Sequence, residues 1–213
     1  MLQTQTVKEE TFELLKKLMQ EKMLTNFYLV GGTALALYLG HRISIDLDLF
    51  TQDSFDSVKL SDHLIKKYNF KSDFIEKNTI KGTINNVKVD FITYNYPFVE
   101  KTFAENNIRL CSMIDIVAMK LSVIVDDGTR LKDFIDIACL STRFSLSDML
   151  SAYEKKYKNS NVVAVLKGLT YYDDVNIKEK IICSSGIYKW KKIKKRLYDM
   201  MLERDMLFKS LPV

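Results

Sequence analysis

The sequence FYLVGGTALALYLGHRISIDLDLF, residues 27–50, contains the pattern that decides the fold. A short apolar strand leads into Gly31 and Gly32, which turn the chain into a short helix predicted over residues 33–39. Residues 43–50 then alternate between apolar and polar side chains. That alternation predicts a strand with one apolar face. The order strand, glycine turn, helix, strand indicates that an α/β part begins the chain.

Two carboxylates, Asp46 and Asp48, stand one residue apart in the second strand. Side chains at i and i+2 share a face, so both carboxylates can reach one metal site. The glycines let backbone N–H groups approach phosphates closely, and the N-terminus of the following helix favours an anion. Thr33 adds a hydroxyl donor. Arg42 and Ser44 either orient the carboxylates or contact phosphate, although Arg42 could equally form a surface ion pair.

Asp90 occupies a polar-side position in a further strand predicted over residues 87–94. If that strand lies beside residues 43–50, a third carboxylate joins Asp46 and Asp48. Three hard oxygen ligands suit Mg²⁺ or Mn²⁺, held together with substrate phosphates. The alternative for each carboxylate is a polar position on a solvent-facing strand. The glycine turn in its strand–helix context favours the metal site.

The periodicity becomes helical after about residue 110. We therefore expect an α+β chain with a mixed-sheet core over residues 1–110 and a helical region over residues 111–213 packed against it. Within the core, helices are predicted over residues 6–24 and 57–68 and strands over 73–78 and 79–84. The helical region is predicted to contain helices over residues 113–125, 131–140, 147–157, 162–171 and 188–208.

Lys120 is a charged residue in an almost wholly apolar helix, and it does not lie on the stripe formed by Asp115 and Ser122. A charge in such a helix needs a partner. A phosphate or carboxylate in the site is the interpretation we favour, and a snorkelling lysine or structural ion pair is the alternative. Asp133 and Asp136 share a face of the next helix. Because runs of charged residues usually face solvent, a solvated helix face is one interpretation for both.

Two blocks of this sequence resemble nucleotidyltransferases of the AbiEii/AbiGii toxin family, in the polymerase-β-like superfamily. The first is residues 27–50, with its glycine pair, arginine–serine and Asp-x-Asp in order. The second is MKLSVIVDDGTRLKDFIDIACL, residues 119–140, with Lys120, Arg130 and Asp133 at the family's positions. The resemblance covers roughly residues 25–140.

The resemblance implies a nucleotidyltransferase fold and transfer of an NMP from an NTP, with Mg²⁺ or Mn²⁺ as cofactor and release of pyrophosphate. It places Lys120 near the triphosphate and Asp133 or Asp136 near the reaction centre. The family often acts as a toxin with a cognate antitoxin, and the acceptor hydroxyl could belong to RNA, such as a tRNA end, or to a protein. Two alternatives stay open: a non-catalytic module that binds nucleic acid or antitoxin, and an aminoglycoside-type small-molecule nucleotidyltransferase.

Charge is unevenly distributed along the chain. The net charge is +5, and residues 151–213 hold 14 Lys and Arg against 7 Asp and Glu. The basic run over residues 188–196, which also contains two aromatics, could bind a nucleic-acid backbone or form the solvated side of a helix. His41 and His63 stand in no nucleophile pattern, which argues against histidine-based covalent catalysis.

The apolar segments and the cysteines indicate in which cellular compartment the protein is expected. No apolar run approaches the roughly 20 residues that span a bilayer, and the first ten residues contain no signal-peptide core. Three scattered cysteines without metal-type spacing suit a reducing compartment. We therefore expect a cytoplasmic protein that makes no contact with a membrane.

Overall fold

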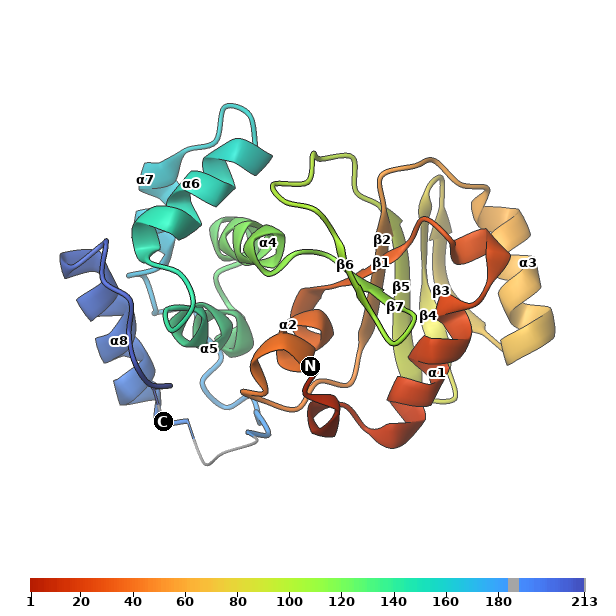
Figure 1. Cartoon of the computed structure of the whole chain (residues 1–213), viewed down its shortest axis with the longest axis horizontal. Helices are drawn as coiled ribbons and strands as arrows, with labels where there is room; N and C mark the ends of the chain where they lie inside the picture. The colour runs from red at the N-terminus through yellow and green to blue at the C-terminus, as the bar shows by residue number, and fades with distance from the viewer. Residues whose placement is uncertain (184–187, 213) are drawn as a thin grey trace.

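A mixed β-sheet runs through the N-terminal half of the computed structural model, which describes residues 1–183 and 188–212 (Figure 1). Within the described residues the sheet has seven strands in the order β3-β4-β5-β2-β1-β7-β6. The strands are β1 (Tyr28–Val30), β2 (Leu47–Thr51), β3 (Lys71–Glu76), β4 (Thr79–Ile84), β5 (Val87–Thr93), β6 (Phe103–Glu105) and β7 (Ile108–Leu110). The pairs β2–β5 and β1–β7 are parallel and the others antiparallel. The α+β class and the mixed sheet are thereby confirmed.

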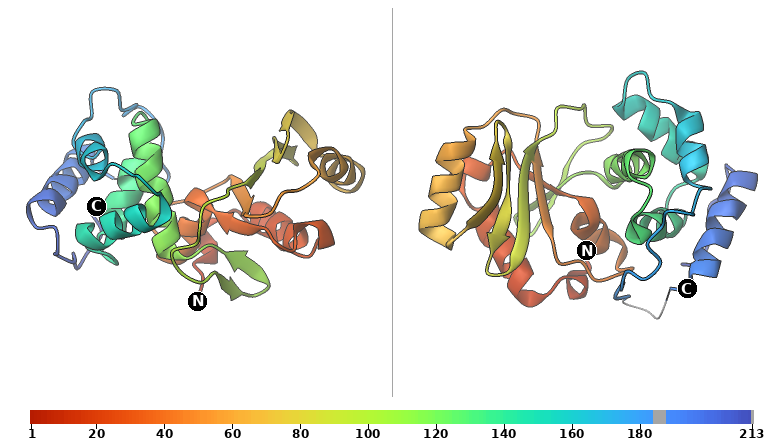
Figure 2. Two further views of the ribbon diagram at one scale, coloured as in Figure 1. Left: turned by 90° about the horizontal axis from the view of Figure 1, so that it is seen from above. Right: turned by 180° about the vertical axis from the view of Figure 1, so that it is seen from behind.

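The helices form two groups around this sheet. They are α1 (Glu9–Met19), α2 (Gly31–Leu39), α3 (Ser57–Tyr68), α4 (Met113–Asp126), α5 (Leu131–Leu140), α6 (Leu146–Lys156), α7 (Val162–Gly168) and α8 (Trp190–Leu202). Helices α1 and α3 lie with the sheet, whereas α4 to α8 form a separate helical half, and α2 lies between the two (Figures 1 and 2). Helix α2 therefore connects the sheet to α4 and α5.

Local sequence signals explain where these helices begin and end. Asp56 caps α3 by accepting from the backbone N–H of Lys59, and Ser112 caps α4 in the same way. Ser145 and Asp148 form a capping box at α6. Among the described residues no helix is long and apolar enough to cross a membrane.

The strand predicted over residues 43–50 is wrong at its start, since β2 begins only at Leu47. The backbone N–H of Ile43 donates to Ile182 O at 2.7 Å, and that of Ser44 donates to Thr6 O at 2.9 Å. Residues 42–44 are therefore extended, but they bond to two other segments and not to a neighbouring strand of the sheet. Asp46 consequently lies just before β2, whereas Asp48 lies within it.

The β6–β7 hairpin was not predicted. Its turn is Asn106–Asn107, and both asparagines have positive φ, 52° and 63°. A two-residue hairpin turn of this type needs positive φ at both positions, and asparagine tolerates it better than most residues. The same signal recurs at Asn85–Asn86 between β4 and β5. Paired asparagines therefore mark these two-residue hairpin turns of the sequence.

Candidate active site

Asp48 and Asp90 lie side by side at the centre of the sheet. The parallel register of β2 and β5 pairs Asp48 directly with Asp90, and Asp46 precedes Asp48 by two residues. The neighbouring strands that the sequence argument required are therefore present. On the opposite edge of β2, the antiparallel register pairs Asp48 with Val30, the last residue before the glycines. The strand order thus brings three carboxylates and the glycine junction together.

These carboxylates have little positive charge in direct contact. Burial raises the pKa of Asp48 to about 6, and the negative charges of Asp90 and Asp46 add to that rise. Burial also raises the pKa of Asp90. Its Oδ1 is buried without a hydrogen-bond partner, and Lys81 Nζ is 3.9 Å from Oδ2. Neighbouring carboxylates that are desolvated in this way favour a bound cation.

Glycine is required at the strand–helix junction for two physical reasons. Gly31 has φ +68°, and a Cβ there would fall 2.3 Å from Asp48 Oδ2. A Cβ on Gly32 would fall 2.4 Å from Arg42 Nη2. The first turn of α2 therefore lies directly against one carboxylate and one guanidinium. The first backbone N–H groups of a helix have no partner within the helix, and those of α2 start beside Asp48, as a phosphate-binding helix start requires.

Thr33 and Ser44 have structural partners in this arrangement. Thr33 Oγ1 hydrogen-bonds Ser44 Oγ at 2.9 Å and also the carbonyl oxygen of Asp46. Thr33 is buried, whereas Ser44 lines the cleft described below. The Thr33 hydroxyl thus fixes the backbone that carries Asp46, and its contact with a nucleotide stays a prediction.

Asp136 is the centre of a buried ionic network under the glycine junction. Arg42 donates to its two oxygens from Nε and Nη2, at 2.7 and 2.9 Å. His41 Nε2 lies 2.8 Å and Lys120 Nζ 2.7 Å from the same carboxylate. Although burial raises it, the pKa of Asp136 is held well below its usual range by Arg42 and Lys120. Burial lowers the pKa of His41, so its ring is neutral at pH 7 and donates from Nε2.

Lys120 bridges two carboxylates. Its Nζ lies 2.6 Å from Asp133 Oδ1 in addition to its contact with Asp136. Arg130 Nε approaches Asp133 Oδ2 at 2.9 Å, at angles that make an ion pair but no hydrogen bond. Lys120 therefore has carboxylate partners, in the structural ion pair that was the alternative interpretation. Lys120 also lines the cleft, whereas Asp133 and Asp136 lie behind it, so the catalytic role of Asp133 and phosphate contact by Lys120 stay predictions.

A cleft of about 580 Å³ opens in front of the three carboxylates. One wall comes from the glycine junction, residues 42–46 and strands β2, β4 and β5, and the other from α4, the start of α5 and residues 179–182. Lys132, which belongs to the second block of the resemblance, also lines it, together with three cations that were not predicted from the sequence: Lys81, Lys88 and Lys180. Lys88 was recognisable, because it is two residues before Asp90 and shares its face. Lys180 carried no such signal, since a loop brings it there.

The carboxylates present fit the predicted metal ion, although they do not form a complete set of metal ligands. In the described parts of the chain, no three Asp, Glu, His or Cys side chains converge as a ready metal site. Mg²⁺ is usually held by one or two carboxylates together with substrate phosphates, so a finished cage is not required. The partnerless Oδ1 of Asp90 beside Asp48 supplies the oxygen chemistry that such an ion takes.

The aromatic residues of the basic run point into the protein. Tyr188 donates its hydroxyl to His41 O at 2.9 Å, and the Trp190 ring packs edge-on against Phe134. Lys191, Lys194 and Lys195 remain exposed on α8. The two aromatics of the basic run therefore offer no exposed ring for stacking beside these cations.

A mixed sheet whose central carboxylates face a glycine-led helix start defines a nucleotidyltransferase. The chain belongs to the family described as Nucleotidyl transferase AbiEii toxin, Type IV TA system, which matches residues 13–203. This family implies an NTP substrate and a cognate antitoxin. An uncharacterized protein of Aquifex aeolicus (strain VF5) is 32% identical over 174 residues, covering 79% of this chain and 84% of that protein.

Solved structures share the fold. JHP933 from Helicobacter pylori matches with a TM-score of 0.54 and 16% identity, over 93% of each chain. MenT4, a nucleotidyltransferase toxin from Mycobacterium tuberculosis H37Rv, matches with a TM-score of 0.54 and 14% identity, over 91% of this chain and 84% of that chain. At such identities the likeness shows the architecture alone.

Proposed function

We propose that this chain moves an NMP from an NTP to an acceptor hydroxyl, at the cleft in front of Asp48 and Asp90. The observation that carries the proposal is the register pairing of these two carboxylates on adjacent parallel strands, with Gly31 packed against Asp48. The buried, partnerless Oδ1 of Asp90 lies on the strand beside Asp48, which itself lies against a helix start, and this arrangement suits a cation and a phosphate held together.

Asp46, Asp48 and Asp90 would hold Mg²⁺ or Mn²⁺. Such an ion, when bound with the nucleotide, neutralises charge on the phosphate oxygens and on the leaving group. The rest of the site belongs to the chain itself. Backbone N–H groups at Gly31 and Gly32 would bind the triphosphate, with Ser44 beside them.

Positive charge for the phosphate chain comes from the same part of the cleft. Arg42 lies against Gly32, and Lys120, Lys132 and Lys180 also line the cleft. Arg42 and Lys120 together face Asp133 and Asp136, so their charges are largely compensated. We therefore assign the long-range attraction of the NTP to the exposed Lys180 and the partly exposed Lys132, and the fixed geometry to the buried network.

The transfer step is a displacement at the α-phosphorus. The acceptor oxygen forms a bond to that phosphorus while the bond to the bridging oxygen of pyrophosphate breaks. Asp90 Oδ1, which has no hydrogen-bond partner, would take the proton of the acceptor hydroxyl. Pyrophosphate leaves with the electron pair of the broken bond. Catalysis is then mostly positioning and charge stabilisation.

We further propose that the acceptor is RNA, such as a tRNA end, or a protein hydroxyl, and that the transfer makes the chain a toxin that its antitoxin neutralises. Support for RNA comes from the exposed lysines of α8 and the basic balance of residues 151–213. A small-molecule acceptor is the second candidate, to be separated by the choice of acceptor in the assay.

The test is transfer of label from α-³²P NTPs to total RNA, total protein or an aminoglycoside, with Mg²⁺, with Mn²⁺ and with EDTA. We expect metal-dependent labelling that Asp48→Asn reduces by at least about 100-fold, in the range seen when one electrostatic group is removed from a transition-state site. Asp62→Asn is the matched control, because Asp62 is an exposed carboxylate on α3 outside the cleft. Asp48→Asn with the wild-type rate would refute this mechanism.

Failure of the wild-type protein to bind or transfer any NTP would leave the non-catalytic module as the better account. Labelling of the aminoglycoside alone would assign the small-molecule role. Each outcome therefore supports one of the candidate functions of the cleft.

A further inference from the structure

The sheet face that carries the carboxylates continues into a group of aromatic rings. Phe50 follows Asp48 by two residues on β2, so its side chain shares that face. Strand pairing places Tyr28 of β1 opposite Phe50, and Tyr94 follows the end of β5. The open face of the sheet is thus acidic at its centre and aromatic beyond it.

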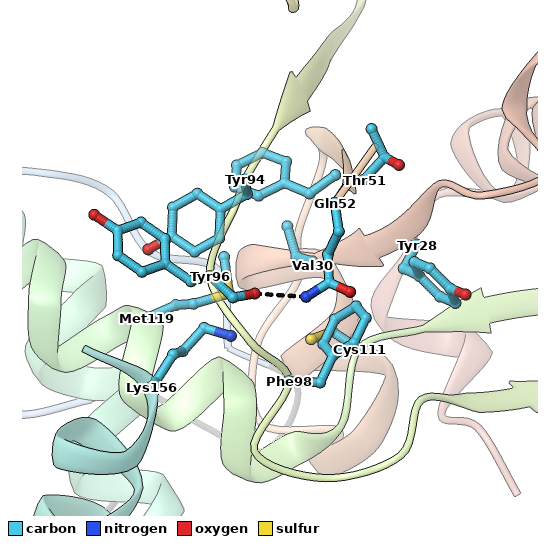
Figure 3. Close-up of a pocket in the computed structure, with 11 residues that line it drawn as sticks. Tyr28, Val30, Thr51, Gln52, Tyr94, Tyr96, Phe98, Cys111, Met119 and Lys156 are labelled. Carbon is cyan, nitrogen blue, oxygen red and sulfur yellow. Dashed lines mark hydrogen bonds between the residues drawn. The ribbon is translucent and has the colours of Figure 1, made fainter. Parts of the chain in front are cut away.

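The rings contact one another and border the cleft. The centroids of Phe50 and Tyr94 are 5.4 Å apart, and those of Tyr94 and Tyr96 are 4.8 Å apart. Phe50 and Tyr94 line both the cleft and the narrow apolar cavity of Figure 3. Neither ring is fully buried, and Tyr96 is 43% exposed. Half-exposed rings at the border of a site are surfaces on which a planar ligand ring can stack.

Polar contacts hold these rings in place. Tyr94 and Tyr157 share a hydroxyl–hydroxyl hydrogen bond of 2.5 Å, and Gln52 Nε2 donates to Tyr96 O at 2.6 Å (Figure 3). Lys156 Nζ is 2.8 Å from Asp115 and 5.8 Å from the centre of the Tyr94 ring. The platform formed by Phe50 and Tyr94 is therefore preorganised by helix α6.

Cations and rings lie on opposite sides of the carboxylates. Along residues 42–50 the order is Arg42, Ser44, the two carboxylates and then Phe50. Lys88 precedes Asp90 on the parallel strand β5, at the level of residue 46. Apart from the buried Lys156, the described residues that line the narrow cavity of Figure 3 include no Lys or Arg. The phosphate chain therefore belongs at the basic end.

The geometry of the transfer step then indicates which substrate binds at the aromatic end of the cleft, where Phe50 and Tyr94 lie. In an in-line displacement the attacking and leaving oxygens lie on opposite sides of the phosphorus. With pyrophosphate leaving toward the basic end, the acceptor hydroxyl approaches from the side of Phe50 and Tyr94. We infer that Phe50 and Tyr94 form the acceptor subsite and select an acceptor with a planar ring, such as a nucleobase, beside its hydroxyl. This inference rests on the proposed transfer activity.

The test compares two RNA oligonucleotides of one sequence, one ending in a normal nucleoside and the other in an abasic ribose that keeps its hydroxyls. We expect the wild-type protein to use the base-bearing end with a KM about 10-fold or more below that of the abasic end, as loss of one stacked base implies. Phe50→Leu and Tyr94→Leu should raise the KM for the base-bearing end and remove the preference. Phe50→Trp, which keeps a ring, should retain the preference.

Folding and nucleotide binding are monitored in the same variants by thermal unfolding and by the KM for the NTP. Tyr171→Leu is the control, since Tyr171 is an exposed tyrosine that follows α7 and lies outside both the cleft and α8. Equal use of both ends by the wild-type protein, or labelling of protein hydroxyls with no labelling of either oligonucleotide, would overturn the acceptor assignment and leave the proposed function intact. No transfer to any acceptor would instead overturn the proposed function.

Discussion

Gly31 lies so close to Asp48 that a Cβ on the glycine would fall 2.3 Å from Asp48 Oδ2. The glycine also has φ +68°, which an L-residue adopts only at a cost of about 1–2 kcal/mol. Gly40, at the end of the same helix, has φ +69° but lies beside Gln3 and not beside a carboxylate of the site. Comparing substitutions at the two glycines therefore separates the effect of backbone strain on stability from the effect of displacing Asp48 on activity.

Gly31→Ala and Gly40→Ala are expected to lower the free energy of unfolding by similar amounts, about 1–2 kcal/mol each from the left-handed backbone. Only Gly31→Ala should also abolish transfer, because its methyl displaces Asp48. Urea unfolding and the labelling assay measure the two effects. Equal transfer rates in both variants would show that the close approach to Asp48 has no part in catalysis.

Asp136→Asn should be among the most destabilising substitutions in this chain. It leaves Arg42, Lys120 and His41 facing a neutral amide in a buried place, and breaking a buried ionic group commonly costs about 3–5 kcal/mol. Urea unfolding of the wild-type protein and the variant measures the difference. The control is Asp199→Asn, which removes the exposed pair between Lys195 and Asp199 on α8 and should cost at most about 1 kcal/mol. Similar losses in both variants would contradict the central role of Asp136.

The sequence predicted the central carboxylates and the glycine turn of the site, but it did not predict how the cleft walls are built. Alternation and the glycine pair predicted the strand–helix–strand unit and the place of Asp48 in its second strand, because those depend on neighbours in the chain. The shared face of Asp46 and Asp48 stays a prediction, since Asp46 lies just before β2. The pairing of Asp48 with Asp90 could be stated only as a condition, since strand order depends on the whole sheet. The solvated face that was one interpretation for Asp133 and Asp136 is wrong, since both are buried, and α5 packs against α2 and α4, which no local pattern reports.

Glu21 predicts how stability depends on pH, away from the cleft. Although burial raises it, the pKa of Glu21 is lowered to about 2 by hydrogen bonds from Lys67, Tyr68 and His63. A carboxyl with a lowered pKa stabilises the folded state fully above its unfolded pKa, near 4.5, and loses that contribution as pH falls toward 2.

Glu21→Gln should therefore destabilise the protein at pH 7 and have a much smaller effect at pH 3. The free energy of unfolding at both pH values, from urea titrations, measures this. Asp62→Asn, on the exposed surface of α3, corrects for the general effect of losing one negative charge. A destabilisation by Glu21→Gln that is unchanged between pH 7 and pH 3 would exclude Glu21 as the titrating group.

Metal binding should depend on the nucleotide. No finished cage is present among the described residues, so two or three carboxylates alone should bind Mg²⁺ weakly, and the phosphates of an NTP should complete the site. We expect Mg²⁺ alone to change the melting temperature little, and Mg²⁺ with a non-hydrolysable NTP analogue to raise it by several degrees through linkage. Asp90→Asn should remove the combined effect, because it takes away the carboxylate paired with Asp48, whereas Asp62→Asn should retain it. A rise with Mg²⁺ alone that equals the rise with both ligands would mean that the carboxylates form a complete metal site without the phosphates.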